Sequence, residues 1–326
     1  MLLGLGRDNN RARVKQLQEG LAHFGYHPGS ADGIFGEKTE VALEAWQAKS
    51  KLYPDGLFGN DSATVWNEQC NAKNVPQFLF LRDQEIGPPL DDSLPRLKWA
   101  TLAATPMPNN HGFKSLVMRE DAAAAYKKLD TFVSCQGGYM TTAGGKRGLS
   151  AEASPSRSKK SFHYTGRAFD LATYSALGDP DTDPFLCVRE EGSRNWTVWC
   201  RVVDKDAPTA HQVPVVTLDV TICHHKKTSS GKRYTQLEVV KWTGQAFSLT
   251  ARARELGFEP IRGRTSFFSG GNYMGAEWWH FQWIEGLVKG KSTFGGELLR
   301  VYSLAECKKF VYWNDSKDAA FGVAWF

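Results

Sequence analysis

The sequence lacks any long hydrophobic run. No apolar stretch among its 326 residues approaches the ~18 residues that a membrane-spanning helix needs, so we expect no insertion into a membrane. Glycine (31 residues) and proline (14 residues) are too few for a disordered or fibrous chain. Hydrophobic residues make up 41% and charged residues 23%, which is typical of a globular protein, and the length suggests about two domains.

Cysteine is sparse, with six residues and no C-x-x-C pair. This spacing argues against a structural zinc knuckle. The even count fits free buried thiols as well as one or two disulfides. Cys187, Cys200 and Cys223 share one region, so they are the first candidates for pairing if any disulfide forms.

A strong excess of charge of either sign is also absent. The net charge is +5, with −2 in residues 1–72 and +7 in the remainder. The basic residues are dispersed rather than aligned along one helix, so we expect no nucleic-acid partner. The positive remainder fits an anionic ligand, and a solvated basic face explains it as well.

The N-terminal part contains an internal repeat. Asp32–Gly36 (DGIFG) recurs as Asp55–Gly59 (DGLFG), 23 residues later. Asp-Gly favours a turn, the aromatic residue can pack inward, and the second glycine lets the chain bend into a helix. Apolar residues at helical spacing predict helices over residues 11–24 and 36–47, and a shorter third helix beginning at 62–66.

These motifs resemble the peptidoglycan-binding domain (type 1) found beside many cell-wall hydrolases. The resemblance rests on V-x-x-L-Q-x-x-L-x-x-x-G-Y, D-G-x-F-G-x-x-T, W-Q and the second D-G-x-F-G, and it covers residues 8–70. It implies a three-helix bundle over residues 1–72 that binds peptidoglycan. The alternative is a bundle whose turns only pack, or one that binds another polymer.

Proline is concentrated after the bundle, in residues 73–112. Because proline disfavours both helices and sheet ladders, we expect an extended linker there. Good helix formers, with acidic residues first and lysines last, predict a helix over residues 118–130. We expect a strand at 131–134 and a loop at 141–160.

The remainder, residues 113–326, predicts a second domain. Alternating or β-rich segments predict strands, and one helix is expected at 249–256. The strand segments are 167–173, 196–203, 213–223, 234–242 and 277–283. The fold class we expect is therefore α+β with an antiparallel sheet, with an insertion at about 178–240 that contains its own hairpins.

Two of the eight histidines lie near acidic residues. His163 precedes Asp170 by seven residues, and a loop followed by a strand can bring these two side chains to one point. His280 follows Glu277 by three residues, in the segment EWWHFQW. Two imidazoles and one carboxylate form the three-ligand set of a catalytic zinc site, with water in the fourth position.

Zinc lowers the pKa of that water to about 7, and a free carboxylate must then accept its proton and pass it to the leaving amine. Glu277 is the candidate for this role, because it lies beside a metal ligand. The sequence contains no H-E-x-x-H, which argues against the common helical zinc-protease arrangement.

The set S-x-H-x-x-G-x-A-x-D followed by E-W-W-H-F resembles the VanY/VanX-like zinc D-Ala-D-Ala peptidases. It covers roughly residues 115–175 and 245–285. The resemblance implies one zinc ion bound by His163, Asp170 and His280, with Glu277 as the general base. The related lysostaphin branch ends in H-x-H, which this chain lacks.

One departure from this family concerns a cation. Members carry S-G-Y-R ahead of the histidine, whereas Met140 occupies the arginine position here. We expect Arg147, or less favourably Arg157, to stabilise the oxyanion instead, because losing such a donor costs ~2.7–4 kcal/mol. Without a fixed arginine, an endopeptidase that cuts cross-linked stem peptides becomes a candidate beside a D,D-carboxypeptidase.

Three further residues are expected to bind substrate: Ser161, Tyr139 and Trp279. Alternation in a strand sends Trp278 and Trp279 to opposite faces, so we expect one ring in the core and the other in the substrate groove. His224 and His225 beside Cys223 form no second metal site in this interpretation, because neighbouring strand residues face opposite ways.

The sequence thus predicts a zinc peptidase that hydrolyses stem-peptide amides next to D-Ala and acts at the cell wall, in the periplasm or outside the cell. The alternative is a non-catalytic wall-binding protein with a degenerate peptidase domain. The start MLLGLGRDNNRAR does not resemble a signal peptide. Export by phage lysis (an endolysin), by a secretion system (an antibacterial effector) or with prior leader removal remains open, as does an inhibitor or immunity protein as partner.

Overall fold

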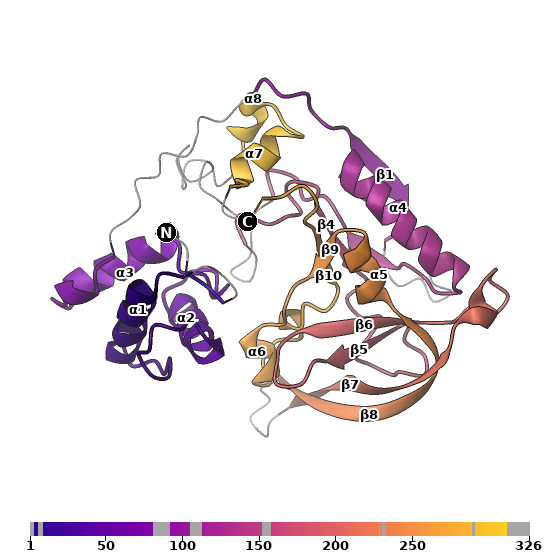
Figure 1. Ribbon diagram of the computed structural model, residues 1–326, viewed down its shortest axis with the longest axis horizontal. Coiled ribbons are helices and arrows are strands. Elements are labelled where there is room, and N and C mark those ends of the chain that lie inside the picture. The colour runs from indigo at the N-terminus through magenta and orange to yellow at the C-terminus, as the bar shows by residue number, and fades with distance from the viewer. Residues whose placement is uncertain are drawn as a thin grey trace. The chain divides into compact units, whose positions relative to one another are not determined.

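The computed structural model describes residues 3–5, 9–80, 92–104, 113–151, 158–227, 229, 233–288 and 291–311. They divide into two compact units. Residues 3–80 make up most of the first unit, and residues 92–150 and 162–311 make up the second. Three N-terminal helices precede antiparallel sheets with further helices, so the fold class is α+β as expected from the sequence (Figure 1).

The first unit is a bundle of three helices of equal length. These are α1 (Arg11–His23), α2 (Glu37–Lys49) and α3 (Asn60–Ala72), each of 13 residues. The third helix was expected to be shorter. It runs full length because Trp66 and Cys70, one helical turn apart, are both wholly buried in the bundle core.

The repeated DGxFG turns are fastened by a buried glutamine from the preceding helix. Gln18 accepts a hydrogen bond from the backbone N–H of Gly33 (2.9 Å) and donates to the Ile34 carbonyl (3.0 Å). Gln47 makes the same pair of bonds to Gly56 (2.9 Å) and to the carbonyl of Leu57 (2.9 Å). Each copy of the repeated sequence is therefore held by the same two hydrogen bonds with a glutamine side chain.

Aromatic rings fill the centre of the bundle, as the turn pattern predicts. Phe35 and Phe58 are buried, and the Trp46 and Trp66 rings meet edge to face, with centroids 4.9 Å apart. Phe80 also belongs to this core and follows the short helix η1 (Pro76–Phe78). The bundle thus continues past the Ala72 end of α3 into the segment expected to be linker.

The second unit contains three antiparallel sheets. The first pairs β1 (Trp99–Ala103) with β2 (Ser115–Arg119). The second has the order β3 (Thr142–Gly144), β4 (Ala168–Leu171), β10 (His280–Trp283) and β9 (Phe258–Pro260). The third has the order β5 (Phe185–Arg189), β6 (Trp196–Arg201), β8 (Arg233–Ser248) and β7 (Val215–Lys227). The second sheet carries the candidate site.

Three expectations about this unit were wrong. Residues 142–144 form the strand β3, within the stretch 141–160 that was expected to be a loop. Residues 99–103 lie in the paired strand β1, although the proline-rich region was expected to form no ladder. Residues 131–134 belong to helix α4 (Glu120–Cys135) rather than to a strand. Tyr126, Leu129 and Val133 recur at helical spacing and are buried, so packing outweighs the β propensity of Thr131–Val133.

The remaining helices of the second unit are short. They are α5 (Leu249–Glu255), α6 (Thr265–Phe268), α7 (Phe294–Leu299) and α8 (Leu304–Cys307), with 3-10 turns η2 (Ala210–Gln212) and η3 (Tyr273–Gly275). Helix α5 agrees with the helix expected at 249–256. Its Ser248 N-cap accepts a hydrogen bond from the backbone N–H of Ala251, and Gly257 follows its end with φ of 80°.

The insertion forms the third sheet, whose hairpins β5/β6 and β7/β8 match the expectation of local hairpins. Phe185 and Cys187 lie on the face that joins the main core, whereas Leu186 belongs to a separate apolar cluster with Val220 and Trp242. Because both faces carry apolar residues, this sheet is built into the unit. It is not a loosely attached hairpin.

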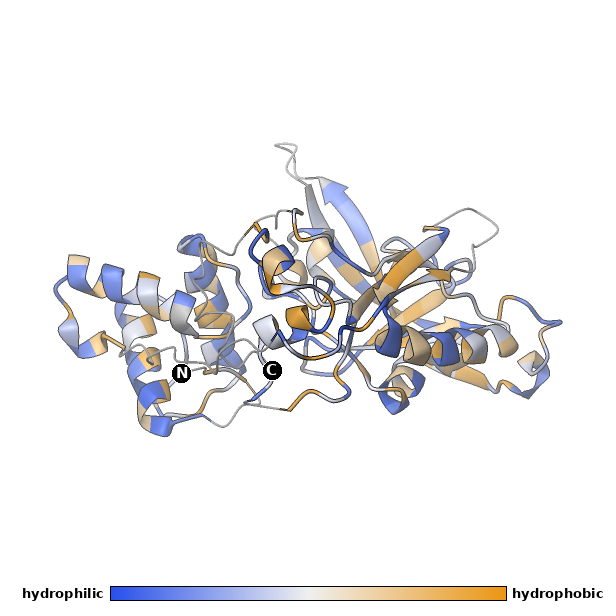
Figure 2. Cartoon of the chain, turned by 90° about the horizontal axis from the view of Figure 1, so that it is seen from above, coloured by the Kyte–Doolittle hydropathy of each residue, from blue (hydrophilic) through white to orange (hydrophobic). Residues whose placement is uncertain are grey.

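All six cysteines lie in described residues and are free thiols, so the disulfide alternative is not seen. No helix in the described ranges combines the length and hydrophobicity needed to cross a bilayer. Figure 2 shows hydrophilic and hydrophobic residues side by side along the helices, as expected of elements with one face on a core.

Candidate metal centre

The register of β4 and β10 places the first two site residues together. Asp170 and His280 are directly opposed in the ladder, so their side chains leave the same face of the sheet. Their neighbours Phe169 and Phe281 are likewise opposed and point to the other face, where the rings stack with centroids 5.2 Å apart and planes 4° apart. The buried phenylalanine pair therefore fixes which face carries the polar pair.

His163 reaches the same point from the turn that leads into β4. The turn closes through a hydrogen bond from the Gly166 N–H to the His163 carbonyl (3.2 Å). Gly166 has φ of 71°, and a Cβ there would lie 2.5 Å from the Trp99 ring. Glycine is therefore required for the turn that delivers His163.

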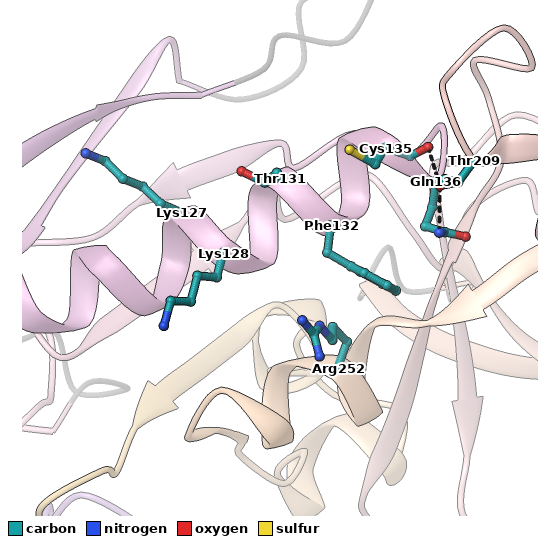
Figure 3. A pocket seen from close by; sticks show the side chains of 8 residues that line it. All are labelled: Lys127, Lys128, Thr131, Phe132, Cys135, Gln136, Thr209 and Arg252. Atoms are coloured by element: carbon teal, nitrogen blue, oxygen red, sulfur yellow. Dashed lines mark hydrogen bonds between the residues drawn. The ribbon is translucent and has the colours of Figure 1, made fainter.

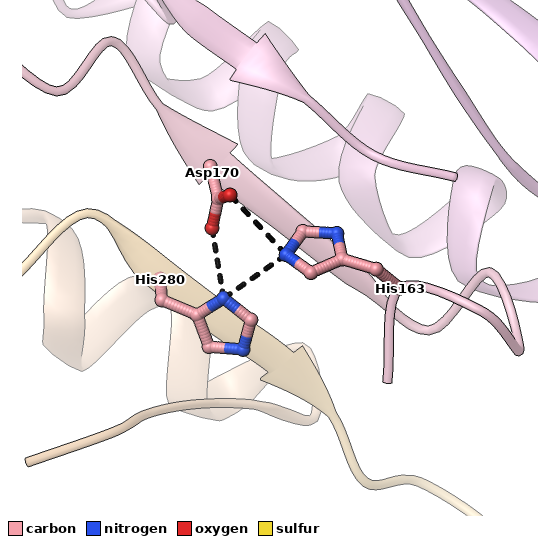
Figure 4. Close-up of side chains that lie close together, drawn as sticks. All are labelled: His163, Asp170 and His280. Carbon is pink, nitrogen blue, oxygen red and sulfur yellow. Dashed lines mark hydrogen bonds and ion pairs between the residues drawn. The ribbon is translucent and has the colours of Figure 1, made fainter. Parts of the chain in front are cut away.

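Three ligand atoms converge, as Figure 4 shows. His163 Nε2 lies 3.2 Å from His280 Nδ1 and 3.2 Å from Asp170 Oδ2, and His280 Nδ1 lies 2.8 Å from Asp170 Oδ1. Ligands about 2.0–2.1 Å from a tetrahedral ion stand about 3.3 Å apart, which is close to these spacings. The donor set thus fits one small divalent cation, and it is the group of this kind found among the described residues.

His163 is also oriented from behind. Its Nδ1 donates to the Gly145 carbonyl (2.5 Å), which leaves Nε2 as the nitrogen that faces the other two ligands. Metal-binding histidines are commonly held in this way, through the ring nitrogen that does not bind the metal. His163 and His280 are both buried, so little solvent competes for their ring nitrogens.

The two imidazoles favour the ionised form of the Asp170 carboxylate. Burial alone raises its pKa, but the charges of His163 and His280 and their hydrogen bonds hold that pKa far below its usual range. Asp170 is therefore ionised at neutral pH, as a metal-binding carboxylate must be.

Glu277 lies three residues before His280 in the chain but is not one of the converging groups. It is 8% exposed, and its carbonyl accepts a hydrogen bond from the N–H of His280 (3.1 Å). Its φ of 53° is left-handed, which is strained for a glutamate. Arg264 contacts its carboxylate in an ion pair.

Sequence reasoning missed Arg264. It precedes Glu277 by 13 residues in an irregular segment with no periodic pattern, so no spacing rule connects the two. The only signal was the surplus of arginine in Arg262–Arg264 (RGR), shortly before the EWWH motif.

The arginine expected as oxyanion donor, Arg147, lies close to His163 through its backbone. Its N–H donates to the His163 carbonyl (3.0 Å), and its guanidinium lies over the Tyr164 ring, 5.2 Å from the centroid. Met140 is wholly buried in the main core, so that position carries packing alone. The other candidate, Arg157, falls outside the described residues.

The expected division of the tryptophan pair is not seen. Trp278 is wholly buried and Trp279 is 4% exposed, and both belong to the main core. Trp279 stacks on Tyr273 (5.9 Å, 22°), which in turn stacks on the exposed Tyr174 (5.3 Å, 17°). Within this stack, the ring exposed to solvent is therefore that of Tyr174.

Of the two other expected substrate residues, Tyr139 is half-buried, one residue before the core residue Met140. Ser161 is half-buried and lies two residues before His163. Their roles remain predictions. His224 pairs with Glu238 on the exposed hairpin (2.7 Å) and belongs to no metal-ligand group found in the described ranges.

A shallow hollow elsewhere on the second unit has different chemistry. It lies between α4 and α5 and encloses about 570 Å³ (Figure 3). Lys127, Lys128 and Arg252 surround it together with Phe132, and it contains neither histidine nor carboxylate. Its lining therefore offers no set of metal ligands.

Comparison with known families identifies only the N-terminal part. Residues 10–64 match the family model described as a peptidoglycan binding domain. No curated protein and no solved structure matches the chain. Association with the cell wall therefore rests on a family match, whereas the candidate metal centre rests on the geometry of its side chains.

Proposed function

We propose that this protein is a zinc-dependent peptidoglycan peptidase whose N-terminal bundle holds it on the cell wall. The observation that carries the proposal is the convergence of His163, Asp170 and His280 in a chain that also contains a peptidoglycan-binding domain. The expected substrate is a stem-peptide amide next to D-Ala, as the resemblance to VanY/VanX-like peptidases implies.

The side chains present fit a zinc ion. Two imidazole nitrogens and one carboxylate are a usual zinc donor set, and they leave a fourth position for water or substrate. When bound, zinc would polarise the peptide carbonyl and acidify a water molecule. Magnesium and calcium favour oxygen ligands, so the two imidazoles disfavour them.

The chain's own residues would carry the proton. Glu277 takes the proton of the attacking water and delivers it to the amine that leaves when the amide bond breaks. Its seclusion from solvent supports this role, since bulk water would otherwise compete for the proton. Arg147 remains a proposed oxyanion donor, because its backbone is anchored to His163.

The bundle would act by tethering. Binding to an insoluble polymer raises the effective concentration of stem peptides at the active site without improving the site itself. Residues 1–72 carry a net negative charge, so electrostatic attraction to an anionic polymer does not explain wall binding by the bundle.

Digestion of purified cell wall tests the proposal. The protein is incubated with intact peptidoglycan, with and without a zinc chelator, and the soluble products are identified by mass spectrometry. We expect chelator-sensitive release of either single D-Ala or split cross-links, which separates the carboxypeptidase from the endopeptidase. Wall binding without any peptide release would instead favour the alternative, a non-catalytic wall-binding protein. The observation that supports this alternative is the buried Met140 at the position of the family's arginine.

A further inference from the structure

Glu277 occupies a backbone conformation that side chains rarely adopt, and its surroundings fix it there. Its φ is 53°, although it is neither glycine nor asparagine. The preceding carbonyl, of Ala276, accepts a hydrogen bond from Trp196 Nε1 (2.7 Å), and its own carbonyl accepts one from His280 (3.1 Å). Both peptides flanking the strained residue are therefore held.

The backbone fixes where the Glu277 side chain starts but not where its carboxylate ends. A glutamate side chain has three rotatable bonds, so a separate contact must select one arrangement. Arg264 provides that contact, as an ion pair between its guanidinium and the Glu277 carboxylate. Both side chains are largely buried, with 18% and 11% of their surface exposed, so the pair is little weakened by solvent.

Arg264 is itself anchored. Its N–H donates to the Gly275 carbonyl (2.7 Å), and its carbonyl accepts from the Phe267 N–H (3.0 Å) at the start of α6. These bonds tie Arg264 to the two ends of the segment that leads to Glu277. Arginine suits this task because its planar guanidinium loses little freedom when it pairs with a carboxylate.

We propose that Arg264 is a positioning residue that sets the carboxylate of Glu277 for proton transfer at the metal centre. The inference rests on the proposed function and specifies how its general base is placed. General-base catalysis depends on geometry first, and a displacement of about 1 Å can cost about 100-fold in rate. Arg264 is not among the converging ligand atoms, so metal affinity does not depend on it.

The test compares Arg264→Ala and Arg264→Lys with the wild type. Each full-length variant is assayed for zinc affinity, thermal unfolding, and kcat and KM on a soluble stem peptide. We expect kcat of Arg264→Ala to fall about 100-fold, with KM and zinc affinity within threefold of wild type. Arg264→Lys keeps the charge and should retain more activity than Arg264→Ala. Arg254→Ala, which removes an exposed arginine paired with Glu259, is the matched control and should behave as wild type.

Chemical rescue separates positioning from folding. Guanidinium ions at low, non-denaturing concentration should raise kcat of Arg264→Ala at least fivefold and leave the wild type unchanged. Activity of Arg264→Ala within threefold of wild type, or equal loss of zinc affinity and activity without rescue, would overturn the inference while leaving the peptidase proposal standing. A wild type with no chelator-sensitive activity on any wall substrate would overturn both.

Discussion

At the residue scale, the three ligand side chains converge because each is fixed by a different local constraint. Asp170 and His280 are fixed by strand register, and the Phe169–Phe281 stack on the opposite face opposes any slip. His163 is fixed by its Nδ1–H bond to the Gly145 carbonyl. The site is therefore pre-organised by backbone and core, which is what a catalytic metal centre requires.

Replacing Glu277 with glutamine should separate metal binding from turnover. The amide keeps the size of the side chain but accepts no proton, so Glu277→Gln should bind zinc normally and lose at least 100-fold in kcat. Zinc affinity and peptide hydrolysis are measured on the same preparation. The control is Glu259→Gln, an exposed glutamate of β9 with the same change of charge. Turnover of Glu277→Gln at more than a few per cent of wild type would require another base.

The ligands could be predicted from the sequence, but their supporting contacts could not. The motifs S-x-H-x-x-G-x-A-x-D and E-W-W-H-F, through their resemblance to the VanY/VanX-like zinc peptidases, point to His163, Asp170 and His280. The Arg264–Glu277 pair depends on how an irregular segment folds back, which no periodicity encodes. Trp279 was assigned to the groove because alternation was assumed, whereas the turn before His280 places both tryptophans in the core.

At the element scale, the third sheet braces the segment that carries Arg264 and Glu277. Thr235 of β8 donates from its backbone to the Gly270 carbonyl (3.1 Å) and from its hydroxyl to the Gly271 carbonyl (3.1 Å). Trp196 of β6 bonds to Ala276 and stacks on Phe268 of α6 (5.5 Å, 29°). The insertion therefore supports the candidate site.

Removal of one of these brace contacts should affect both stability and catalysis. Thr235→Val keeps the shape but loses the hydroxyl donor, so the free energy of unfolding should fall by about 1 kcal/mol. Because the lost bond holds the segment before Glu277, kcat should also fall. Thr243→Val, in the exposed Thr217–Thr243 pair of the same hairpin, is the control and should change neither quantity appreciably. An equal effect of the two substitutions would contradict the bracing role.

Asp183, which lies two residues before β5, should make the free energy of unfolding depend on pH. Burial, reinforced by the charge of Asp179, raises the pKa of Asp183 from 3.8 to about 6, despite a hydrogen bond from the Gly178 N–H. Between about pH 4 and pH 6 the folded state therefore binds more protons than the unfolded state, and this residue's contribution to stability is lost as the pH rises.

Asp183→Asn should remove that contribution. Urea unfolding at several pH values from 4 to 7 should show a gain in stability of the variant over wild type that grows as the pH rises through about 4 to 6. The exposed Asp206→Asn serves as the control. A difference that does not change with pH would contradict a raised pKa at Asp183.

Secondary structure was predictable where local pattern and packing agree. The helices of the bundle and α5, and the strands β4, β6, β7, β8 and β10, follow from periodicity. Residues 131–134 were misassigned because their β-branched and aromatic side chains favour strands locally, while Leu129 and Val133 continue a buried helical face. Strand β1 was missed because its partner β2 lies beyond a proline-rich stretch.

At the scale of the whole molecule, the chain combines a bundle that matches a peptidoglycan-binding family with a unit that contains a candidate metal centre. The first is supported by a family match over residues 10–64, the second by converging ligands. Each has its own hydrophobic core, so we expect the two proposed functions to be separable.

Deletion of the bundle should therefore affect only action on insoluble wall. The deletion should extend through Phe80, because Val75 and Phe80 pack in the bundle core. We expect hydrolysis of a small soluble stem peptide to stay within twofold of the full chain, and release from intact wall to fall at least tenfold, since tethering is lost. Both are measured at equal enzyme concentration, and equal losses on the two substrates would contradict the tethering model.

We expect His163, Asp170 and His280 together to hold one zinc ion. Metal content after exhaustive dialysis, measured by elemental mass spectrometry, tests it most directly. We expect one zinc per chain in the wild type and in His224→Ala, which removes an exposed histidine paired with Glu238, and less than a tenth of that in His280→Ala. A wild type without metal, or a His280→Ala variant that keeps it, would rule out a zinc site at these three residues.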